Sequence, residues 1–507
     1  MRTKEEYIQG LKKMRRNIYY DGNLIDRDCE EHGPTLNVMG ITFDAAHDPE
    51  LQHLCTAVSH ISGETINRFN HVHQSAKDLH MKQDMTRILA RKSGFCIQRC
   101  MGIDAVNALN AVSFEADKVN NGETQYHNNF RKWLDTFQKN DLVAACAQTD
   151  VKGERLKRPS EQADPDMYLH VVEQNSDGIV VRGCKNHISQ ASIADEILVL
   201  PTRQIMADEK EYAVGFAIPA DAEGVKQVVT IHDMRKREIF KRRCDHGWSD
   251  SYVIFDDVLV PWDRVFLNGE NDHASIAALL FALFHRHSYS GCKPAVGDIL
   301  LGLAALAAEV NGIEKAPHVK KILADIIKVG ELGYAAGYTA SALAKPEIMI
   351  PGLGDCPYGP GGYFPNSIYA NVGRCLTGEA VFHEAEMLCD LAGGTPATLP
   401  HEKDFANPEM KPLLEKYFKR NPNMDVEDQI KFWMMLAEKT CSSTGTIADY
   451  GAYHGGGSPI MEQIVITMQY NIEARKNMVR WMGGMAVDDN FKFHGDMDIE
   501  KYKEEEN

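Results

Sequence analysis

The stretch "ASIAALLFALFHRHSYSG", residues 274–291, decides the class of fold, because a helical pattern of apolar residues returns here after a long segment of different texture. Its longest apolar run, "IAALLFALF" (276–284), is shorter than the roughly 20 residues that a membrane-spanning helix needs. We therefore expect a buried helix within a core and no association with a membrane.

The sequence on either side of this stretch divides the chain into three parts and a tail. Residues 146–272 carry short alternating runs such as "GIVVRGCKNH" and "SYVIFDDVLVP", separated by Gly, Pro and Asp, which is typical of strands. Residues 1–145 and 273–490 carry apolar residues at three-to-four spacing, which is typical of helices. We expect a mainly α protein with an all-helical N-terminal domain, a middle β barrel or sandwich, a C-terminal helical bundle and an acidic tail (491–507).

Two details of the C-terminal part add to this expectation. Helical runs are expected over 274–291 and 296–312, among others, and long apolar helices of this kind favour a bundle. The Gly/Pro-rich segment 346–366 is predicted to be a loop, and a loop of this length is more often functional than not.

Composition excludes some classes of partner. The chain has 72 acidic and 55 basic residues among 507, a formal net charge of −17, whereas nucleic-acid binding depends largely on Lys and Arg. The N-terminal segment "MRTKEEYIQGLKKMRRNIYY" lacks the apolar core of a signal peptide. We therefore expect a cytoplasmic protein that does not bind nucleic acid.

The cysteines suggest a metal site. Twelve are scattered along the chain without regular spacing, which in a large protein that is not exported indicates reduced thiols. In "RKSGFCIQRCMG" (91–102) the pattern predicts a helix, so that Cys96 and Cys100, four apart, lie on one face. Thiols on adjacent helical turns make a poor disulfide and a good pair of metal ligands.

A second segment offers the other half of such a site. In "LFHRHSYSGCKPAVGD" (283–298), His285 and Cys292 are seven residues apart and share one helical stripe, with Tyr289 between them. Three thiolates and one imidazole favour an iron–sulfur cluster or zinc over hard cations. The spacing does not choose between the two metals.

Several blocks together carry a resemblance to a known family. They are "INRFNHVHQSAKDL", "CIQRCMGIDAVNA", "TDVKGER", "DGIVVRGCKNHIS", "VIFDDVLVPWDRVFL", "HRHSYSGCKPAVGDILLG" and "YHGGGSP". In order and spacing, over nearly the whole chain, they resemble the 4-hydroxyphenylacetate 3-hydroxylase flavoprotein family, and within it the hydroxyacyl-CoA dehydratases. The resemblance implies an acyl-CoA dehydrogenase-like fold, a homotetramer (a dimer of dimers), FAD, and a 4Fe-4S cluster held by Cys96, Cys100, His285 and Cys292.

The resemblance also implies a reaction. The expected activity is radical-type dehydration of a hydroxyacyl-CoA, such as 4-hydroxybutyryl-CoA to crotonyl-CoA, and isomerisation of vinylacetyl-CoA is a possible second activity. His285 is expected to bind the iron that opens to substrate and to act as a base, because imidazole is a weaker iron ligand than thiolate. Tyr289 matches a proton or hydrogen donor, Lys293 a residue near the cluster charge or the thioester, and Asp250 a catalytic acidic residue.

Three segments match cofactor-contacting parts of the family. Thr149, Asp150 and Lys152 lie in the first, and His187 and Ser189 lie in the second. The third is a glycine turn in which backbone can approach a flavin or a CoA phosphate closely. It comprises His454, Gly455, Gly456, Gly457 and Ser458.

The match fails at two acidic positions. Gly451 stands where the dehydratases carry a glutamate, and Asp250 is one methylene shorter than its counterpart. If either of the family's two carboxylates is indispensable, we expect this chain to act on another hydroxyacyl-CoA, to perform another elimination, or to use Asp449 or Glu462 instead. Two further alternatives remain open: a reduced-flavin-dependent aromatic monooxygenase of the parent family, and a non-catalytic assembly with structural zinc.

Overall fold

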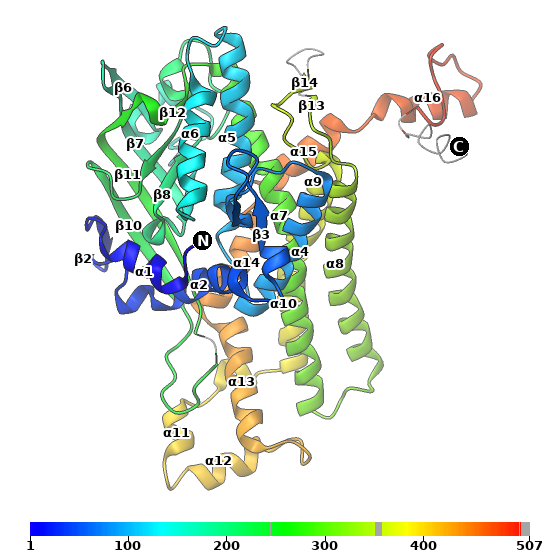
Figure 1. Cartoon of the computed structure of the whole chain (residues 1–507). Coiled ribbons are helices and arrows are strands. Elements are labelled where there is room, and N and C mark those ends of the chain that lie inside the picture. The colour runs from blue at the N-terminus through cyan, green and yellow to red at the C-terminus, as the bar shows by residue number, and fades with distance from the viewer. Residues whose placement is uncertain (244, 350–356, 496, 498–507) are drawn as a thin grey trace.

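The computed structural model of the chain describes residues 1–243, 245–349, 357–495 and 497. Helices come first, most of the strands lie in the middle, and helices follow again (Figure 1). The fold is therefore mainly α with a central β part, as the sequence predicts. Within the predicted loop, residues 350–356 lie outside the described residues, as do residues 496 and 498–507 of the predicted tail.

The N-terminal part consists mainly of helices with clear local signals. Thr3 and Glu6 form a reciprocal capping box. Ser75 caps the start of a long helix, and Gly94, at φ +80°, ends it in the left-handed conformation. The helices are α1 (Lys4–Lys12), α2 (Gly33–His47), α3 (Gln52–Cys55), α4 (Ala76–Ser93), α5 (Cys100–Val119) and α6 (Tyr126–Lys139).

The expectation of an all-helical N-terminal part is wrong in detail. Strands β1 (Ile18–Tyr20) and β2 (Asn23–Ile25) form a hairpin, and β1 pairs in parallel with β10 (Val225–Asp233) of the middle part. The hairpin turns at Asp21 and Gly22, which both have positive φ, and Asp-Gly between apolar residues is a strong hairpin signal. A second small pair, β3 (Thr56–Val58) and β4 (Thr65–Asn67), lies between α3 and α4.

The middle part contains two sheets around one shared core. The larger sheet has the order β2-β1-β10-β11-β7-β6 and the smaller one β12-β9-β8-β5. Val181 and Phe255 of the larger sheet belong to the same apolar cluster as Ile197 and Phe216 of the smaller. The remaining strands are β5 (Ala144–Ala147), β6 (His170–Gln174), β7 (Gly178–Ser189), β8 (Glu196–Val199), β9 (Val214–Pro219), β11 (Gly247–Pro261) and β12 (Val265–Asn268).

Helix α7 (Asn271–Val310) organises the C-terminal part. The two runs expected at 274–291 and 296–312 form this one 40-residue helix, which continues through Pro294. Proline has no N–H, so the carbonyl of Ser290, four residues earlier, has no helical donor at that position. Gln83 of α4 donates to that carbonyl at 3.3 Å, which compensates for the missing bond.

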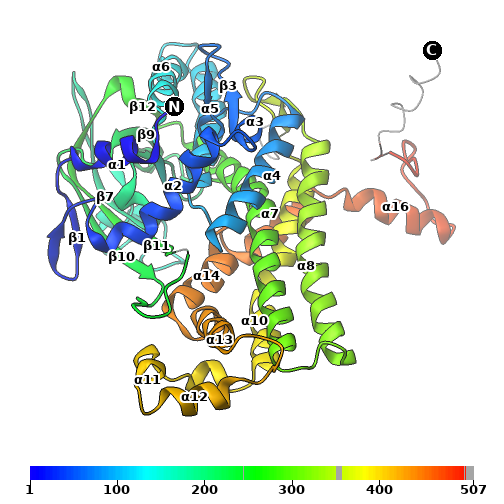
Figure 2. The same cartoon turned by 60° about the horizontal axis from the view of Figure 1, so that its bottom comes forward.

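Helix α7 is, in the described part of the chain, the helix that is long and apolar enough to cross a membrane. The most apolar window of this helix is 61% buried inside the fold. It packs against α4 and α5 of the N-terminal part and against α8 (Pro317–Ala342) of the C-terminal part (Figures 1 and 2). These are the surroundings of a core helix, as the sequence predicts.

The other helices complete the bundle and an extension below it. Helices α9, α10 and α13 pack around α7, and α11 and α12 lie at one end (Figure 1). Beyond α7 and α8, this part contains β13 (Ile348–Met349), β14 (Pro357–Tyr358), α9 (Ser367–Glu379), α10 (Val381–Ala392), α11 (Glu402–Ala406), α12 (Lys411–Phe418), α13 (Val426–Cys441), α14 (Ser443–His454), α15 (Pro459–Gln469) and α16 (Ile472–Met482).

The C-terminal arm, defined here as α15 and α16 with residues 483–495, begins at the bundle, where α15 packs against α9, and then leaves the body. Both views show α16 separated from the bundle (Figures 1 and 2). The arm exposes large apolar side chains, which is unusual for a surface that stays in water. They include Ile460, Met468, Val479, Trp481, Met482 and Phe493.

Candidate functional site

The segment between α4 and α5 differs from the predicted helix. Helix α4 ends at Ser93, α5 begins at Cys100, and Cys96 lies between them outside any helix. Two left-handed residues cause the break: Gly94 at φ +80° and Gln98 at φ +61°. The two cysteines are therefore brought together by a turn of the backbone and not by helical spacing.

The four predicted ligands nevertheless converge, and we call Cys96, Cys100, His285 and Cys292 the cysteine site. Hydrogen bonding with the thiols of Cys100 and Cys292 lowers the pKa of Cys96 well below its usual value. The same interaction with Cys96, reinforced by burial, raises the pKa of Cys100 and of Cys292. A ring nitrogen of His285 lies within 4.8 Å of the sulfur of Cys100. Segments almost 200 residues apart thus place four soft donors in one buried region.

Asp104 orients His285 and was not predicted from the sequence. Its Oδ2 lies 3.0 Å from Nδ1 of His285, and its Oδ1 accepts a 3.0 Å hydrogen bond from Nζ of Lys82. Burial would raise the pKa of Asp104, but Lys82 and His285 lower it below the usual value. A carboxylate at Nδ1 keeps the proton there and leaves Nε2 available as a ligand. The available signal was an acidic residue four after Cys100 in a nearly apolar helix.

Gln98 is a second residue that the sequence did not single out. It lies between the two cysteines of the α4–α5 segment, and its backbone N–H donates to the sulfur of Cys96 at 3.3 Å. Its side chain is buried, yet neither Oε1 nor Nε2 has a hydrogen-bond partner within the described residues. Buried amides are normally satisfied, so this one is a candidate contact for a bound group.

Tyr289 lies one helical turn from His285 and faces α14. Its hydroxyl donates to the carbonyl of Ala452 at 2.7 Å, and the guanidinium of Arg374 lies 4.3 Å from the centre of its ring. Burial raises the pKa of Tyr289, and the charge of Arg374 opposes this effect only in part. The tyrosine is therefore a neutral hydroxyl held at a fixed position.

Lys293 has a defined buried partner. It forms an ion pair with Glu384 of α10, and both side chains are almost completely buried. The other carboxylate oxygen of Glu384 has no partner among the described residues. Lys293 is therefore not a surface lysine, and its charge is paired with that of Glu384 within the protein.

The first predicted cofactor segment contains one residue with a structural role. Asp150 forms a buried 2.9 Å ion pair with Lys185 and accepts a hydrogen bond from the backbone of Leu169. The carbonyl of Thr149 accepts from the backbone N–H of Asn186. Lys152 has a left-handed backbone at φ +75°, and burial lowers its pKa. Asp150 thus holds the segment against β7, which leaves Thr149 and Lys152 as candidate contacts.

The second segment meets Asp250 across the larger sheet. Residues Ser189 of β7 and Asp250 of β11 are paired in register, and the hydroxyl of Ser189 donates to Oδ1 of Asp250 at 2.6 Å. Burial lowers the pKa of His187, Asp250 opposes the shift, and Lys152 and His454 add to it. These interactions indicate that the predicted cofactor segments lie near one another.

Two arginines hold the glycine turn, residues 454–458 at the junction of α14 and α15, by hydrogen bonds to backbone carbonyls. Arg286 donates to the carbonyl of Gly456 at 3.0 Å, and Arg374 donates to the carbonyl of Tyr453 at 2.8 Å. A Cβ on Gly456 would lie 2.4 Å from Nε of Arg374, so glycine is required by this close approach. His454, Gly455, Gly457 and Ser458 are exposed.

The structure also places the carboxylates that could replace the missing glutamate. Asp449 forms an ion pair with Lys439. Glu462 is buried, with Oε1 at 3.5 Å from Arg374 and 3.9 Å from Arg286. Burial raises the pKa of Glu462 to about 6, although the two arginines oppose the shift. Of the two, Glu462 is the carboxylate that is not committed to a close ion pair.

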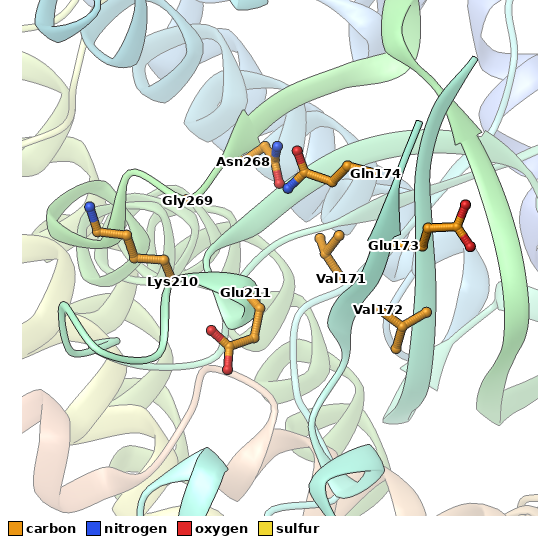
Figure 3. A pocket seen from close by; sticks show the side chains of 8 residues that line it. All are labelled: Val171, Val172, Glu173, Gln174, Lys210, Glu211, Asn268 and Gly269. Atoms are coloured by element: carbon orange, nitrogen blue, oxygen red, sulfur yellow. The ribbon is translucent and has the colours of Figure 1, made fainter. Parts of the chain in front are cut away.

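Two open cavities lie outside these segments. The first, of about 260 Å³, is formed by β6, the start of a short turn at Lys210 and the end of β12 (Figure 3). The second, of about 490 Å³, is lined by residues between Ile61 and Lys139. Neither is lined by any residue of the cysteine site or of the predicted cofactor segments. The first is lined by Val171, Val172, Glu173, Gln174, Lys210, Glu211, Asn268 and Gly269.

Family models cover almost the whole chain. Residues 3–267 match the model described as 4-hydroxyphenylacetate 3-hydroxylase N terminal, and residues 274–484 match 4-hydroxyphenylacetate 3-hydroxylase C terminal. The chain belongs to the 4-hydroxyphenylacetate 3-hydroxylase family. The family resemblance predicted from the sequence is therefore confirmed.

Relatives of two kinds occur within this family. The chain is 35% identical over 500 residues to 4-hydroxybutyryl-CoA dehydratase/vinylacetyl-CoA-Δ-isomerase of Clostridium aminobutyricum. The match covers 95% of this chain and 99% of that protein. It is 28% identical over 491 residues to the 4-hydroxyphenylacetate 3-monooxygenase oxygenase component of Thermus thermophilus, with 94% and 96% covered.

Solved structures show the same two kinds. An oxygen-tolerant archaeal 4-hydroxybutyryl-CoA dehydratase from N. maritimus superposes with a TM-score of 0.90 at 31% identity, over 99% of both chains. An oxygenase component of 4-hydroxyphenylacetate 3-monooxygenase, complexed with FAD and 4-hydroxyphenylacetate, superposes with a TM-score of 0.82 at 25% identity, over 95% and 98% of the chains.

Proposed function

We propose that this protein is a lyase that dehydrates a hydroxyacyl-CoA by radical-type chemistry, with FAD and a 4Fe-4S cluster as cofactors. The observation that carries the proposal is the convergence of three thiols and one imidazole from the α4–α5 segment and α7. The 35% identity to a dehydratase over nearly the whole chain supports the reaction and a CoA thioester as substrate. Isomerisation of vinylacetyl-CoA is proposed as a second activity on the same ground.

The donor set fits a cluster, and the polar segments near β7 and β11 fit a flavin. Cys96, Cys100, Cys292 and His285 would hold the cluster. Thr149, Lys152, His187, Ser189 and the glycine turn would contact FAD, while Asp150 would hold its segment in place. When bound, the cluster supplies a Lewis-acidic iron and FAD supplies one-electron chemistry.

The chain's own residues would position substrate and move protons. Asp104 keeps the proton of His285 on Nδ1, so that Nε2 can accept a proton when it is not a ligand. Asp250, oriented by Ser189, would accept or return a proton at its carboxylate. Tyr289, neutral and fixed, would donate from its hydroxyl, and Lys293 would donate from the ammonium N–H groups that do not contact Glu384.

The oligomeric state, the location and the domain boundaries expected from the sequence are also part of the proposal. We propose a homotetramer, a dimer of dimers, because the C-terminal arm exposes an apolar surface that a second copy would cover. The cytoplasm is the proposed location. The domain boundaries 1–145, 146–272 and 273–490 also stay a proposal, with the reservation that β1 and β2 belong to the larger sheet.

An anaerobic assay tests the reaction against its alternatives. Purified protein is given 4-hydroxybutyryl-CoA, and crotonyl-CoA is measured by mass, while a parallel reaction with reduced flavin, oxygen and 4-hydroxyphenylacetate tests for aromatic hydroxylation. Formation of crotonyl-CoA without hydroxylation supports the proposal. Hydroxylation without dehydration would establish the monooxygenase alternative, and turnover only of longer or branched hydroxyacyl-CoA esters would establish the related lyase.

A further inference from the structure

Trp248 occupies the space beside Gly451. An ideal Cβ built on Gly451 would lie 3.5 Å from Cη2 and 3.8 Å from Cζ2 of this indole, and apart from the chain neighbours and the backbone of α14 itself no other heavy atom of the described residues comes within 4 Å. A longer side chain at position 451 that points toward β11 would therefore meet the indole ring. The ring is part of β11, on the same face as Asp250 two residues later.

Trp248 also lies between the parts of the proposed site. Its ring is 6.3 Å from that of Phe95, the residue that precedes Cys96. Gly451, against which it packs, precedes Ala452, whose carbonyl holds the hydroxyl of Tyr289. The indole thus contacts the cysteine side and the α14 side of the site at once.

The indole N–H of Trp248 has no partner in the part of the chain that the structure describes. Its Nε1 is buried and makes no hydrogen bond within the described residues. A buried donor without an acceptor is costly, and such groups are rare in folded proteins unless a ligand or water satisfies them. The unsatisfied donor and its position near Asp250 point to an acceptor that is supplied by a bound molecule.

We propose that Trp248 is a specificity-determining residue whose ring forms the wall beside Gly451 and whose N–H donates to an oxygen of the substrate's hydroxyacyl chain. This inference rests on the proposed hydroxyacyl-CoA function. The wall offers one donor and otherwise hydrocarbon, so it selects an acyl chain with a compact hydroxyl-bearing end. A carboxylate at position 451 would compete with the indole for this space, and proton transfer on this side falls to Asp250.

The hydrogen bond and the steric wall are tested separately. Trp248→Phe keeps an aromatic ring and removes the donor, and we expect kcat/KM for 4-hydroxybutyryl-CoA to fall about threefold to tenfold. Trp248→Ala opens the wall, and we expect the ratio of kcat/KM for 4-hydroxyvaleryl-CoA over 4-hydroxybutyryl-CoA to rise about tenfold or more. If Trp248→Phe has the kcat/KM of the wild type and Trp248→Ala leaves the ratio for the two substrates unchanged, the proposal is overturned.

A third test needs no substrate. Gly451→Glu should lower the melting temperature by about 2–4 °C, because the new side chain competes with the indole. In the double variant with Trp248→Ala this additional loss should disappear. Gly302→Glu is the matched control, since an ideal Cβ at that exposed helical position meets nothing within 4 Å. If Gly451→Glu lowered the melting temperature equally with Trp248 and with alanine at position 248, the packing of the indole against position 451 would be overturned.

The outcomes also separate this inference from the proposed function. A wild-type protein without dehydratase activity would overturn the proposed function and the substrate contact with it, whatever the coupling between positions 248 and 451. An active wild type with no coupling and no change in selectivity would overturn the role of Trp248 alone.

Discussion

The cysteine site and the glycine turn are built in opposite ways, although both are proposed to bind a cofactor. In the cysteine site, Cys100 and Cys292 are buried, and His285 is held by Asp104. In the glycine turn every residue except Gly456 is exposed, and its fixed contacts come from Arg286 and Arg374. The first arrangement is complete within one chain, whereas the second presents a surface that a flavin or a further subunit would cover.

This difference predicts that the two regions fail independently. Damage to a buried donor should remove metal and leave the open surface intact, because the ligands lie on α7 and the α4–α5 segment. Damage to the turn should weaken flavin binding and leave metal in place. Each prediction below tests that independence.

The largest effect is expected for Cys292→Ser. A serine hydroxyl is a poor ligand for iron, so we expect the variant to lose cluster iron. Dehydratase activity should fall by about 100-fold or more. FAD content should stay near that of the wild type. Iron and flavin are measured per chain after anaerobic purification.

The matched control for this variant is Cys389→Ser, an exposed cysteine on α10. It should retain both iron and activity. Full dehydratase activity in Cys292→Ser would show that this thiol is not needed for the reaction.

Asp104→Asn should have the next largest effect. The amide keeps the size of the side chain but no longer fixes the proton of His285 on Nδ1, and losses of such outer contacts typically weaken metal binding about tenfold to 100-fold. Iron retained per chain is measured during dialysis against a chelator. Asp298→Asn, which removes a partly exposed partner of Arg87 and Arg91 between α7 and α4, serves as the control. Equal iron retention in both variants would argue against a positioning role.

Gly456→Ala should act on the other region. The added methyl would meet Nε of Arg374 at 2.4 Å, so the turn must shift, and we expect FAD affinity to fall about tenfold with iron unchanged. Flavin release is followed by fluorescence. Gly394→Ala, where an added Cβ meets nothing within 4 Å, should behave like the wild type. Loss of iron together with flavin would contradict the independence of the two regions.

The smallest effect concerns pH. Burial raises the pKa of Glu462 from the usual 4.5 to about 6, so the folded state favours the protonated form. Its contribution to stability is present below pH 4.5 and is lost as the pH rises through about 6, an amount of about 2 kcal/mol. Glu462→Gln should therefore gain stability relative to the wild type between pH 5 and pH 7.5, as measured by chemical denaturation. A difference that is constant over this range would show that Glu462 does not titrate there.

The sequence predicted the order of the parts well because periodicity reports burial directly. Alternation identified β7 and β11, and three-to-four spacing identified α4, α5 and α7. It failed where a single residue decides the backbone. Gly94 and Gln98 in the left-handed region break the helix expected around Cys96, and Gln83 compensates for the hydrogen bond that α7 loses at Pro294.

Within the site, the sequence could identify ligands by residue type but not their partners. Asp104 and Arg374 act through contacts between distant segments, and the one local signal, an acidic residue four after Cys100, does not show what Asp104 contacts. The pairing of Ser189 with Asp250 depends on the register of β7 against β11, and this register includes bulges that spacing alone does not reveal. Trp248 was missed because its significance comes from a neighbour, Gly451, that is 203 positions away.

The content of metal and sulfide in the anaerobically purified wild-type protein tests the central claim most directly. If the four donors of the cysteine site hold one 4Fe-4S cluster, each chain contains four iron atoms and four acid-labile sulfides together with one FAD. One zinc atom per chain without sulfide, or flavin without any metal, would contradict the account.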